Sequence, residues 1–135
     1  MHPLLLLAAT LTCPALDTST VAGALGEVQL AVTEKTCVFT NADYRLTLEL
    51  TKLDAPDQFA HYAETACQSG RDIAPIKAIG NEAIVCTLGS AAQTTEKLVS
   101  RVRKQAFTLA LTTSAKKSLR DTNRLFAEQV AGNLF

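Results

Sequence analysis

Residues 44–51 read YRLTLELT, and their alternating pattern sets the class of the fold. Leu46, Leu48 and Leu50 fall on one side of an extended chain, and the polar residues between them fall on the other. Because successive side chains of a strand point to opposite faces, the pattern predicts an antiparallel strand with one buried face. An Asn-Ala-Asp turn at 41–43 precedes this strand.

Further segments with strand character lie on both sides of this stretch. Each combines β-branched or apolar residues with a period of two and is bounded by turn residues; they are 28–32, 37–39, 84–88, 97–103 and 107–111. We expect the segment between Gly70 and Ile79, which contains Pro75, to be a loop. The pattern therefore predicts about six strands.

Three segments have helical character. The first follows Asp17-Thr18-Ser19, which can cap it, and ends at Gly26. The second starts at Asp54 with Pro56 in its first turn, ends at Gly70, and carries one apolar stripe made of Phe59, Tyr62, Ala63, Ala66 and Cys67. The third starts near Ala115, or later at Ser118 to Asp121, and its apolar side comprises Leu119, Phe126, Val130 and Leu134.

The order of these elements predicts a single α+β domain over residues 13–135. The expected arrangement is α-βββ-α-βββ-α: an antiparallel meandering sheet of about six strands with three helices laid on one face. The two halves have similar element order without a repeat at the level of residues. At 135 residues, with 47% hydrophobic residues, the chain has enough apolar side chains for one core.

The first residues resemble an export signal. Residues 4–11 (LLLLAATL) form an apolar or small run that is too short to span a membrane and fits a signal peptide over residues 1–12. Ala8-Ala9 offers a cleavage site, although the residues before the run include no Lys or Arg. The alternative is a buried N-terminal strand or helix. Cleavage would imply a periplasmic or secreted protein.

Four cysteines support export, because an even number in a short chain with a signal-like start predicts disulfides. Of the three possible connectivities, the geometry favours Cys67–Cys86, because one lies on the helix stripe and the other on the inward face of the next strand. Cys13 and Cys37 then pair by elimination. The alternative is four reduced thiols in a cytosolic core. The residues before Cys13, Thr10-Leu11-Thr12, match a lipidation signal poorly.

Charge is balanced over the whole chain, with 13 basic and 13 acidic residues, but not along it. Residues 1–95 carry 5 basic and 10 acidic side chains, whereas residues 96–135 carry 8 basic and 3 acidic. We predict a basic patch that could bind an anionic lipid, a polyanion or an acidic protein, formed by Arg101, Arg103, Lys104, Lys116, Arg120 and Arg124. Ordinary solvated faces are the alternative. Nucleic acid is disfavoured, because the chain has few aromatic residues and no Trp.

The sequence contains few groups suited to catalysis. His61, with Asp57 four residues before it and Glu64 three after, is the one histidine outside the predicted signal and could serve a small hydrolase-like enzyme. The alternative is a surface histidine among ordinary polar neighbours. No nucleophile, phosphate-binding or metal motif is present in the sequence. We therefore expect a non-catalytic binding or structural domain without cofactor or metal.

Several short motifs together resemble small exported bacterial envelope domains of unknown function, many of them lipoproteins. The chain shares with them an early Cys13, a helix ending at Gly26, a Cys-x-aromatic strand at 37–39, a Gly-Asn-Glu-Ala step at 80–83 and an amphipathic helix containing 127–131. The resemblance implies an α+β domain outside the cytoplasm, with no assigned activity and no catalytic residues to transfer.

Overall fold

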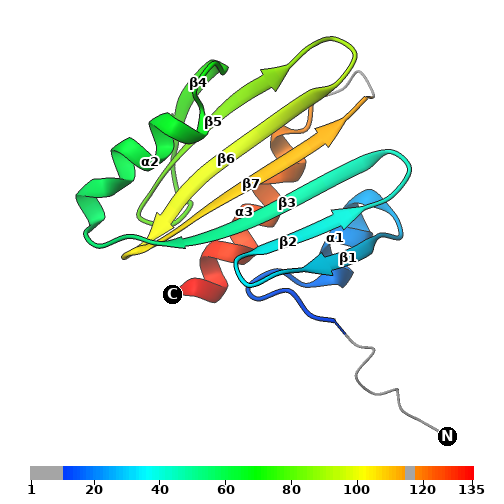
Figure 1. The fold of residues 1–135 in the computed structure, drawn as a ribbon, viewed down its shortest axis with the longest axis horizontal. Helices are drawn as coiled ribbons and strands as arrows, with labels where there is room; N and C mark the ends of the chain where they lie inside the picture. Colours follow the sequence, from blue (N-terminus) through cyan, green and yellow to red (C-terminus); the bar gives the residue numbers. More distant parts are fainter. Residues whose placement is uncertain (1–10, 115–117) are drawn as a thin grey trace, which may run out of the picture.

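A computed structural model describes residues 11–114 and 118–135 and shows a single sheet with helices on both faces (Figure 1). Its helices are α1 (Thr18–Leu25), the 3-10 turn η2 (Pro56–Gln58), α2 (Phe59–Ala66) and α3 (Arg120–Leu134). Its strands are β1 (Gln29–Val32), β2 (Thr36–Thr40), β3 (Tyr44–Lys52), β4 (Arg71–Ile76), β5 (Glu82–Gly89), β6 (Thr94–Val102) and β7 (Gln105–Thr113).

The sheet consists of two antiparallel meanders joined along one seam. Its strand order is β1-β2-β3-β7-β6-β5-β4, so β1–β3 form one meander and β4–β7 the other. The seam is the pairing of β3 with β7, which runs in register from Tyr44↔Thr113 to Lys52↔Gln105. The chain crosses from the end of β3 to the far edge of the sheet through η2 and α2 (Figure 1).

The helices lie on opposite faces of the sheet, so the prediction that all three cover one face was wrong. α3 contacts β6 and β7 on the face that also carries α1, and α2 contacts β6 from the other face. The reason is that β5 and β6 are buried on both sides: Val85 belongs to the core under α3, and Cys86 belongs to the core under α2. A strand buried on both faces needs a helix on each.

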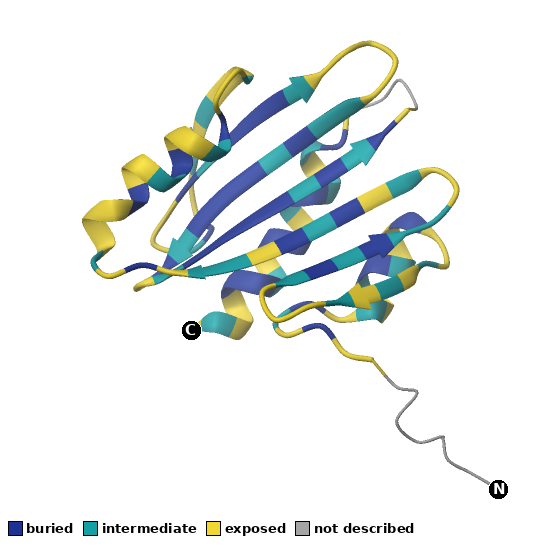
Figure 2. Cartoon of the chain, in the orientation of Figure 1, coloured by how far each residue is buried: buried dark blue, intermediate teal, exposed yellow. Residues whose placement is uncertain are grey.

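The larger core lies between the sheet and the helices α1 and α3. The alternation predicted for β3 is confirmed there, since Leu46 and Leu48 are fully buried. The apolar side predicted for α3 is confirmed as well, with Phe126 and Val130 fully buried. On the opposite face, α2 covers only part of the sheet. Along β1–β3, buried residues alternate with half-buried or exposed ones (Figure 2).

The sheet has seven strands rather than about six, because the segment predicted as a loop forms β4. Proline lacks a backbone N–H and is tolerated at an edge, which is where β4 and its Pro75 lie. A shift of register between Arg71 and Ala74 marks a bulge, and Asp72 within it has a positive φ of 54°. These irregularities removed the alternation on which strand prediction depends.

Two helix boundaries differ from the predicted ones. The second helix begins as the 3-10 turn η2, with no side-chain cap from Asp54; instead the side chain of Gln58 accepts a hydrogen bond from the Asp54 N–H at 2.8 Å. Its α-helical part ends at Ala66, several residues before Gly70. α3 begins at Arg120, which favours the later of the two predicted starts; Ala115 lies outside the described residues.

Both predicted disulfides are present. Cys13 bonds Cys37 and Cys67 bonds Cys86, with Cα–Cα distances of 5.9 and 6.0 Å. Two disulfides indicate an oxidising compartment outside the cytoplasm. None of the helices in the described part of the chain has the length and apolar character needed to cross a membrane. Residues 1–10, which make up most of the predicted signal peptide, lie outside the described residues.

Candidate functional site

A groove of about 600 Å³ lies between α2 and the strands β3, β7 and β6; we call it the β3 groove. The sheet supplies its floor, and one side of α2 supplies a wall. Its lining comprises Glu49, Thr51, Lys52, Leu53, Gln58, His61, Tyr62, Thr65, Ala66, Lys97 and Thr108. The volume is within the range of small-molecule sites in proteins.

Strand alternation places the polar floor of this groove. The leucines of β3 point into the larger core, so Glu49 and Thr51 point to the opposite face, toward α2. Thr108 of β7 is paired in register with Glu49, so these two side chains are neighbours across the seam. Two of the polar residues of YRLTLELT, Glu49 and Thr51, which on sequence alone indicate a solvated face, therefore line a groove.

Polar groups converge on the hydroxyl of Tyr62 at the centre of the groove. The Tyr62 hydroxyl and the Thr108 hydroxyl lie 2.8 Å apart and share a hydrogen bond. Burial raises the pKa of Tyr62 above its ordinary value of 10.0. Hydrogen bonds from Thr108 and Thr51 oppose that rise, and the nearby Glu49 carboxylate adds to it. Tyr62 is therefore held neutral, as a hydrogen-bond donor or acceptor.

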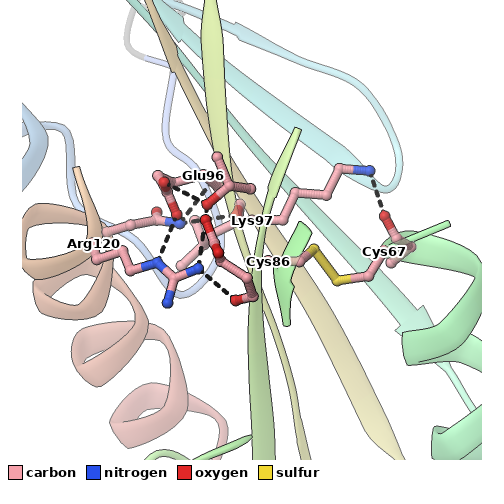
Figure 3. Close-up of a disulfide and its surroundings, with 10 residues drawn as sticks. Cys67, Cys86, Glu96, Lys97 and Arg120 are labelled. Atoms are coloured by element: carbon pink, nitrogen blue, oxygen red, sulfur yellow. Dashed lines mark hydrogen bonds and ion pairs between the residues drawn. A yellow bond between two sulfur atoms is a disulfide. The ribbon is translucent and has the colours of Figure 1, made fainter. Parts of the chain in front are cut away.

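The wall formed by α2 is fixed to the sheet at its C-terminal end (Figure 3). The Lys97 ammonium donates a hydrogen bond of 2.8 Å to the backbone oxygen of Ala66, in the last turn of the helix. A cation is favourable at this position because the carbonyls of a helix C-terminus are unpaired and carry partial negative charge. The next residue, Cys67, forms the disulfide to Cys86 of β5. This wall of the groove is thus joined to the sheet by a hydrogen bond and a disulfide.

A second groove, of about 880 Å³, lies on the other side of α2, between the helix and the edge of the sheet; we call it the β4 groove. Its lining comprises Phe59, Ala60, His61, Ala63, Glu64, Thr65, Cys67, Gln68, Ser69, Gly70, Ile73, Glu82 and Ile84. Ile73, in the bulge of β4, is 57% exposed. α2 is thus a ridge between two grooves.

His61 lies on this ridge and lines both grooves. It is exposed, and so are Asp57 and Glu64, the carboxylates predicted as its partners. Within residues 11–114 and 118–135, no hydrogen bond or ion pair joins His61 to either of them. The described residues also contain no cluster of three or more His, Cys, Asp or Glu side chains arranged to hold a metal.

The structure does not bring the residues of the predicted basic patch together on one surface. Arg101 lies on the α2 face of the sheet, where its guanidinium bonds the Glu82 carboxylate at 2.6 Å. Arg103 and Lys104 are exposed in the turn between β6 and β7. Lys116 lies outside the described residues.

Arg120 lies at the start of α3, on the opposite face of the sheet from Lys97 (Figure 3). Arg101, four residues after Lys97 in β6, points to the same face as Lys97. Its guanidinium donates to the largely buried carboxylate of Glu96 at 3.0 Å, and also to the Thr87 hydroxyl and the Asp72 backbone oxygen. Since Glu96 and Lys97 are neighbours in β6, their side chains point to opposite faces, one toward α3 and one toward α2. Arg120 therefore attaches α3 to three strands.

Arg124, one turn later in α3, pairs with Glu128 at 3.6 Å and donates to the backbone oxygen of Lys77 at 3.0 Å. Arg101, Arg120 and Arg124 thus have partners within the chain, and the sheet separates the first from the other two. A count of basic residues along the sequence does not reveal these pairings, because the partner of each arginine is distant in sequence or on a neighbouring helical turn.

The groove residues were missed by the sequence analysis for a different reason. Tyr62 was assigned to an apolar stripe, Glu49 and Thr51 were placed on the polar face of a strand, and Thr108 was not singled out. One feature of the sequence does point to a polar contact: a tyrosine lies in that apolar stripe, and a Tyr hydroxyl that becomes buried requires a polar partner. The partner, Thr108, lies 46 positions away in sequence.

Comparisons with known proteins give a fold but no family. No protein-family model matches the chain, and no curated protein matches it either. The chain is similar in structure to a crystal structure of a protein from Bacteroides thetaiotaomicron VPI-5482, with a TM-score of 0.53 and 14% sequence identity. The match covers 76% of this chain and 41% of that protein, so the likeness spans less than half of the larger chain. At this identity, the likeness concerns the fold alone.

Proposed function

We propose that the chain is a non-catalytic, exported binding domain of the bacterial cell envelope, periplasmic or secreted, whose ligand occupies the β3 groove. The observation that carries this proposal is the convergence of Glu49, Thr51 and Thr108 on the Tyr62 hydroxyl inside a groove of about 600 Å³. Few convergent polar groups on a partly apolar wall are typical of small-molecule sites.

The chemistry of the lining indicates the kind of ligand. Leu53, Ala66 and the ring of Tyr62 offer apolar contact, and the hydroxyls and the carboxylate offer hydrogen bonds. Two lysines line the groove: Lys97 already donates a hydrogen bond to the Ala66 backbone oxygen, and Lys52 is exposed at the end of β3. The groove therefore suits a small amphipathic molecule with an apolar body and an uncharged hydroxyl head. An anionic head would face the Glu49 carboxylate.

A non-catalytic role is supported by the surroundings of His61, which is exposed and has no hydrogen bond to Asp57 or Glu64 among the described residues. The anionic-partner hypothesis receives no support from Arg101, Arg120 and Arg124, whose guanidinium groups are engaged within the chain.

The proposal is tested by NMR with two probes that share one ring, benzyl alcohol and benzoate. We expect benzyl alcohol to shift the backbone amide signals of residues lining the β3 groove, and benzoate to bind more weakly. Thr108→Val should weaken benzyl alcohol binding about fivefold, the effect of one hydrogen bond. Thr112→Val is the matched control, because Thr112 lies on the same strand, bonds the Thr95 hydroxyl at 2.7 Å and does not line the groove.

Shifts scattered over the surface, or equal effects of the two valine variants, would refute this site. The compartment is tested separately by the intact mass of the protein from its native host. A chain cleaved near residue 12 that gains the mass of two reduced disulfides on reduction supports export. An uncleaved chain with free thiols contradicts it.

A further inference from the structure

The β4 groove combines an exposed apolar side chain with apolar walls. Ile73 is 57% exposed, whereas most large apolar side chains of the described residues are buried. Phe59 and Ala63 of α2 and Ile84 of β5 lie along the same groove. An exposed apolar side chain beside an apolar cleft marks a contact surface more strongly than an isolated one.

The backbone holds Ile73 in this position. It follows Asp72, whose φ of 54° is in the left-handed region that non-glycine residues rarely adopt, and both lie in the bulge of β4. Bulges at sheet edges redirect side chains. The guanidinium of Arg120 donates a hydrogen bond of 2.7 Å to the Asp72 backbone oxygen, which fixes the bulge to α3.

The charges around this groove are acidic. Its lining contains Glu64 and Glu82 but no lysine or arginine. Glu64 is exposed and has no ion-pair partner among the residues that the structure describes, and Glu82 remains 49% exposed beside Arg101. The surrounding segment 54–82 carries five acidic and two basic side chains. A cationic partner fits this surface, and an anionic one does not.

The groove is open to solvent and bounded on one side by a helix and on the other by the last strand of the sheet. A groove between a helix and the edge strand of a sheet has room for a chain segment lying along it.

We propose that the β4 groove binds a cationic amphipathic peptide segment of a partner protein. An apolar side chain of the peptide would cover Ile73 and Ile84, and a lysine or arginine of the peptide would pair with Glu64. This site lies on the opposite side of α2 from the β3 groove and does not depend on the ligand proposed there.

The test uses three fluorescein-labelled dodecapeptides, built from leucine and lysine, leucine and glutamate, or serine and lysine. Binding to the full chain is measured by fluorescence anisotropy. We expect the leucine–lysine peptide to bind most tightly. Ile73→Ser should weaken it about tenfold, from the apolar area left uncovered. Glu64→Lys should weaken it about fivefold and reduce its sensitivity to salt.

Matched control variants distinguish binding in the β4 groove from nonspecific binding elsewhere on the surface. Leu125→Ser removes an apolar side chain that is 49% exposed on α3, and Glu34→Lys makes the same charge change in the turn between β1 and β2. Neither should alter binding. The proposal is overturned if the leucine–glutamate peptide binds equally well, if none of the peptides binds, or if the control variants weaken binding as much as Ile73→Ser and Glu64→Lys. Loss of binding in Thr108→Val would instead place the peptide in the β3 groove and also overturn it.

Discussion

Replacing Cys67 and Cys86 by alanine should lower the free energy of unfolding by about 4 kcal/mol. The bridge spans 19 positions, and freeing a loop of that length in the unfolded chain costs about 3 kcal/mol in the chain-entropy model. Both residues are buried, at 3% and 0% exposed, so losing the sulfur atoms also leaves a small cavity worth about 1 kcal/mol. For a domain of this size, the melting temperature should fall by roughly 15 °C.

The loss of stability should be greatest in α2. α2 has eight residues, and its attachments to the sheet are the disulfide, the hydrogen bond from Lys97, the bond between Tyr62 and Thr108, and a small apolar cluster around Phe59. Without the disulfide, the amides of α2 should exchange with solvent faster than those of β6 and β7. Short helices in isolation have little stability of their own.

Urea unfolding followed by circular dichroism gives the global loss, and native-state hydrogen exchange gives the local one. The variant with Cys13 and Cys37 replaced by alanine is the control: it opens a loop of similar length, with a similar global loss, but should leave exchange in α2 unchanged. A global loss below about 1 kcal/mol would refute the loop-closure reasoning. Equal exchange of α2 in the two variants would refute the claim that this disulfide fixes the groove wall.

Two further predictions concern the polar groove and the backbone. Burial raises the pKa of Tyr62, so its neutral form is favoured by folding; this contribution is complete below the ordinary pKa of 10.0 and is lost as pH rises through the raised value. Phenolate absorbance should show one tyrosine titrating above the ordinary range, and Tyr62→Phe should remove that component; its persistence would contradict the assignment. Gly80→Ala should destabilise the chain by about 2 kcal/mol or more, because Gly80 has φ of 59° and a Cβ there would meet the Arg101 backbone oxygen. Gly132→Ala in α3, where a Cβ meets nothing, should instead stabilise it by about 0.5–1 kcal/mol, and thermal unfolding of both variants distinguishes them.

The sequence predicted those parts of the fold that depend on local pattern. The period of two in β3 identified its buried leucines, and Gly26 marked the end of α1, where it has a positive φ of 88°. The pairing of Cys67 with Cys86 followed from one helical stripe and one strand face. Each of these inferences needs only neighbours along the chain and the direction of successive side chains.

The parts that failed depend on contacts between distant residues. β4 was missed because its bulge and Pro75 break the alternation of an edge strand. The positions of the helices depend on which strands are buried on both faces, which the pattern of one strand cannot reveal. Asn123 shows the same limit: it lies in the first turn of α3 and is only 2% exposed, because its amide donates to the backbone oxygens of Glu96 and Leu109.

The surroundings of the basic residues could not be predicted from the sequence either. Glu96 and Arg120 are 24 positions apart, and each is an ordinary surface residue by its local sequence. Their pairing across the layer between α3 and β6 removed Arg120 from the predicted basic patch. Composition gives the charges available, and the topology decides which of them face solvent.

The seam between β3 and β7 divides the chain into two parts that are each continuous in sequence. The disulfide from Cys13 to Cys37 lies wholly in the first part, and that from Cys67 to Cys86 lies wholly in the second. A cut between β3 and η2 would therefore leave each fragment with its own covalent crosslink and a complete meander. The two fragments would have to recognise each other through the exposed edges of β3 and β7, together with the packing of α3 against α1. The pairing of β3 with β7 thus joins two parts of the chain that are each crosslinked on their own, while a single core extends across both.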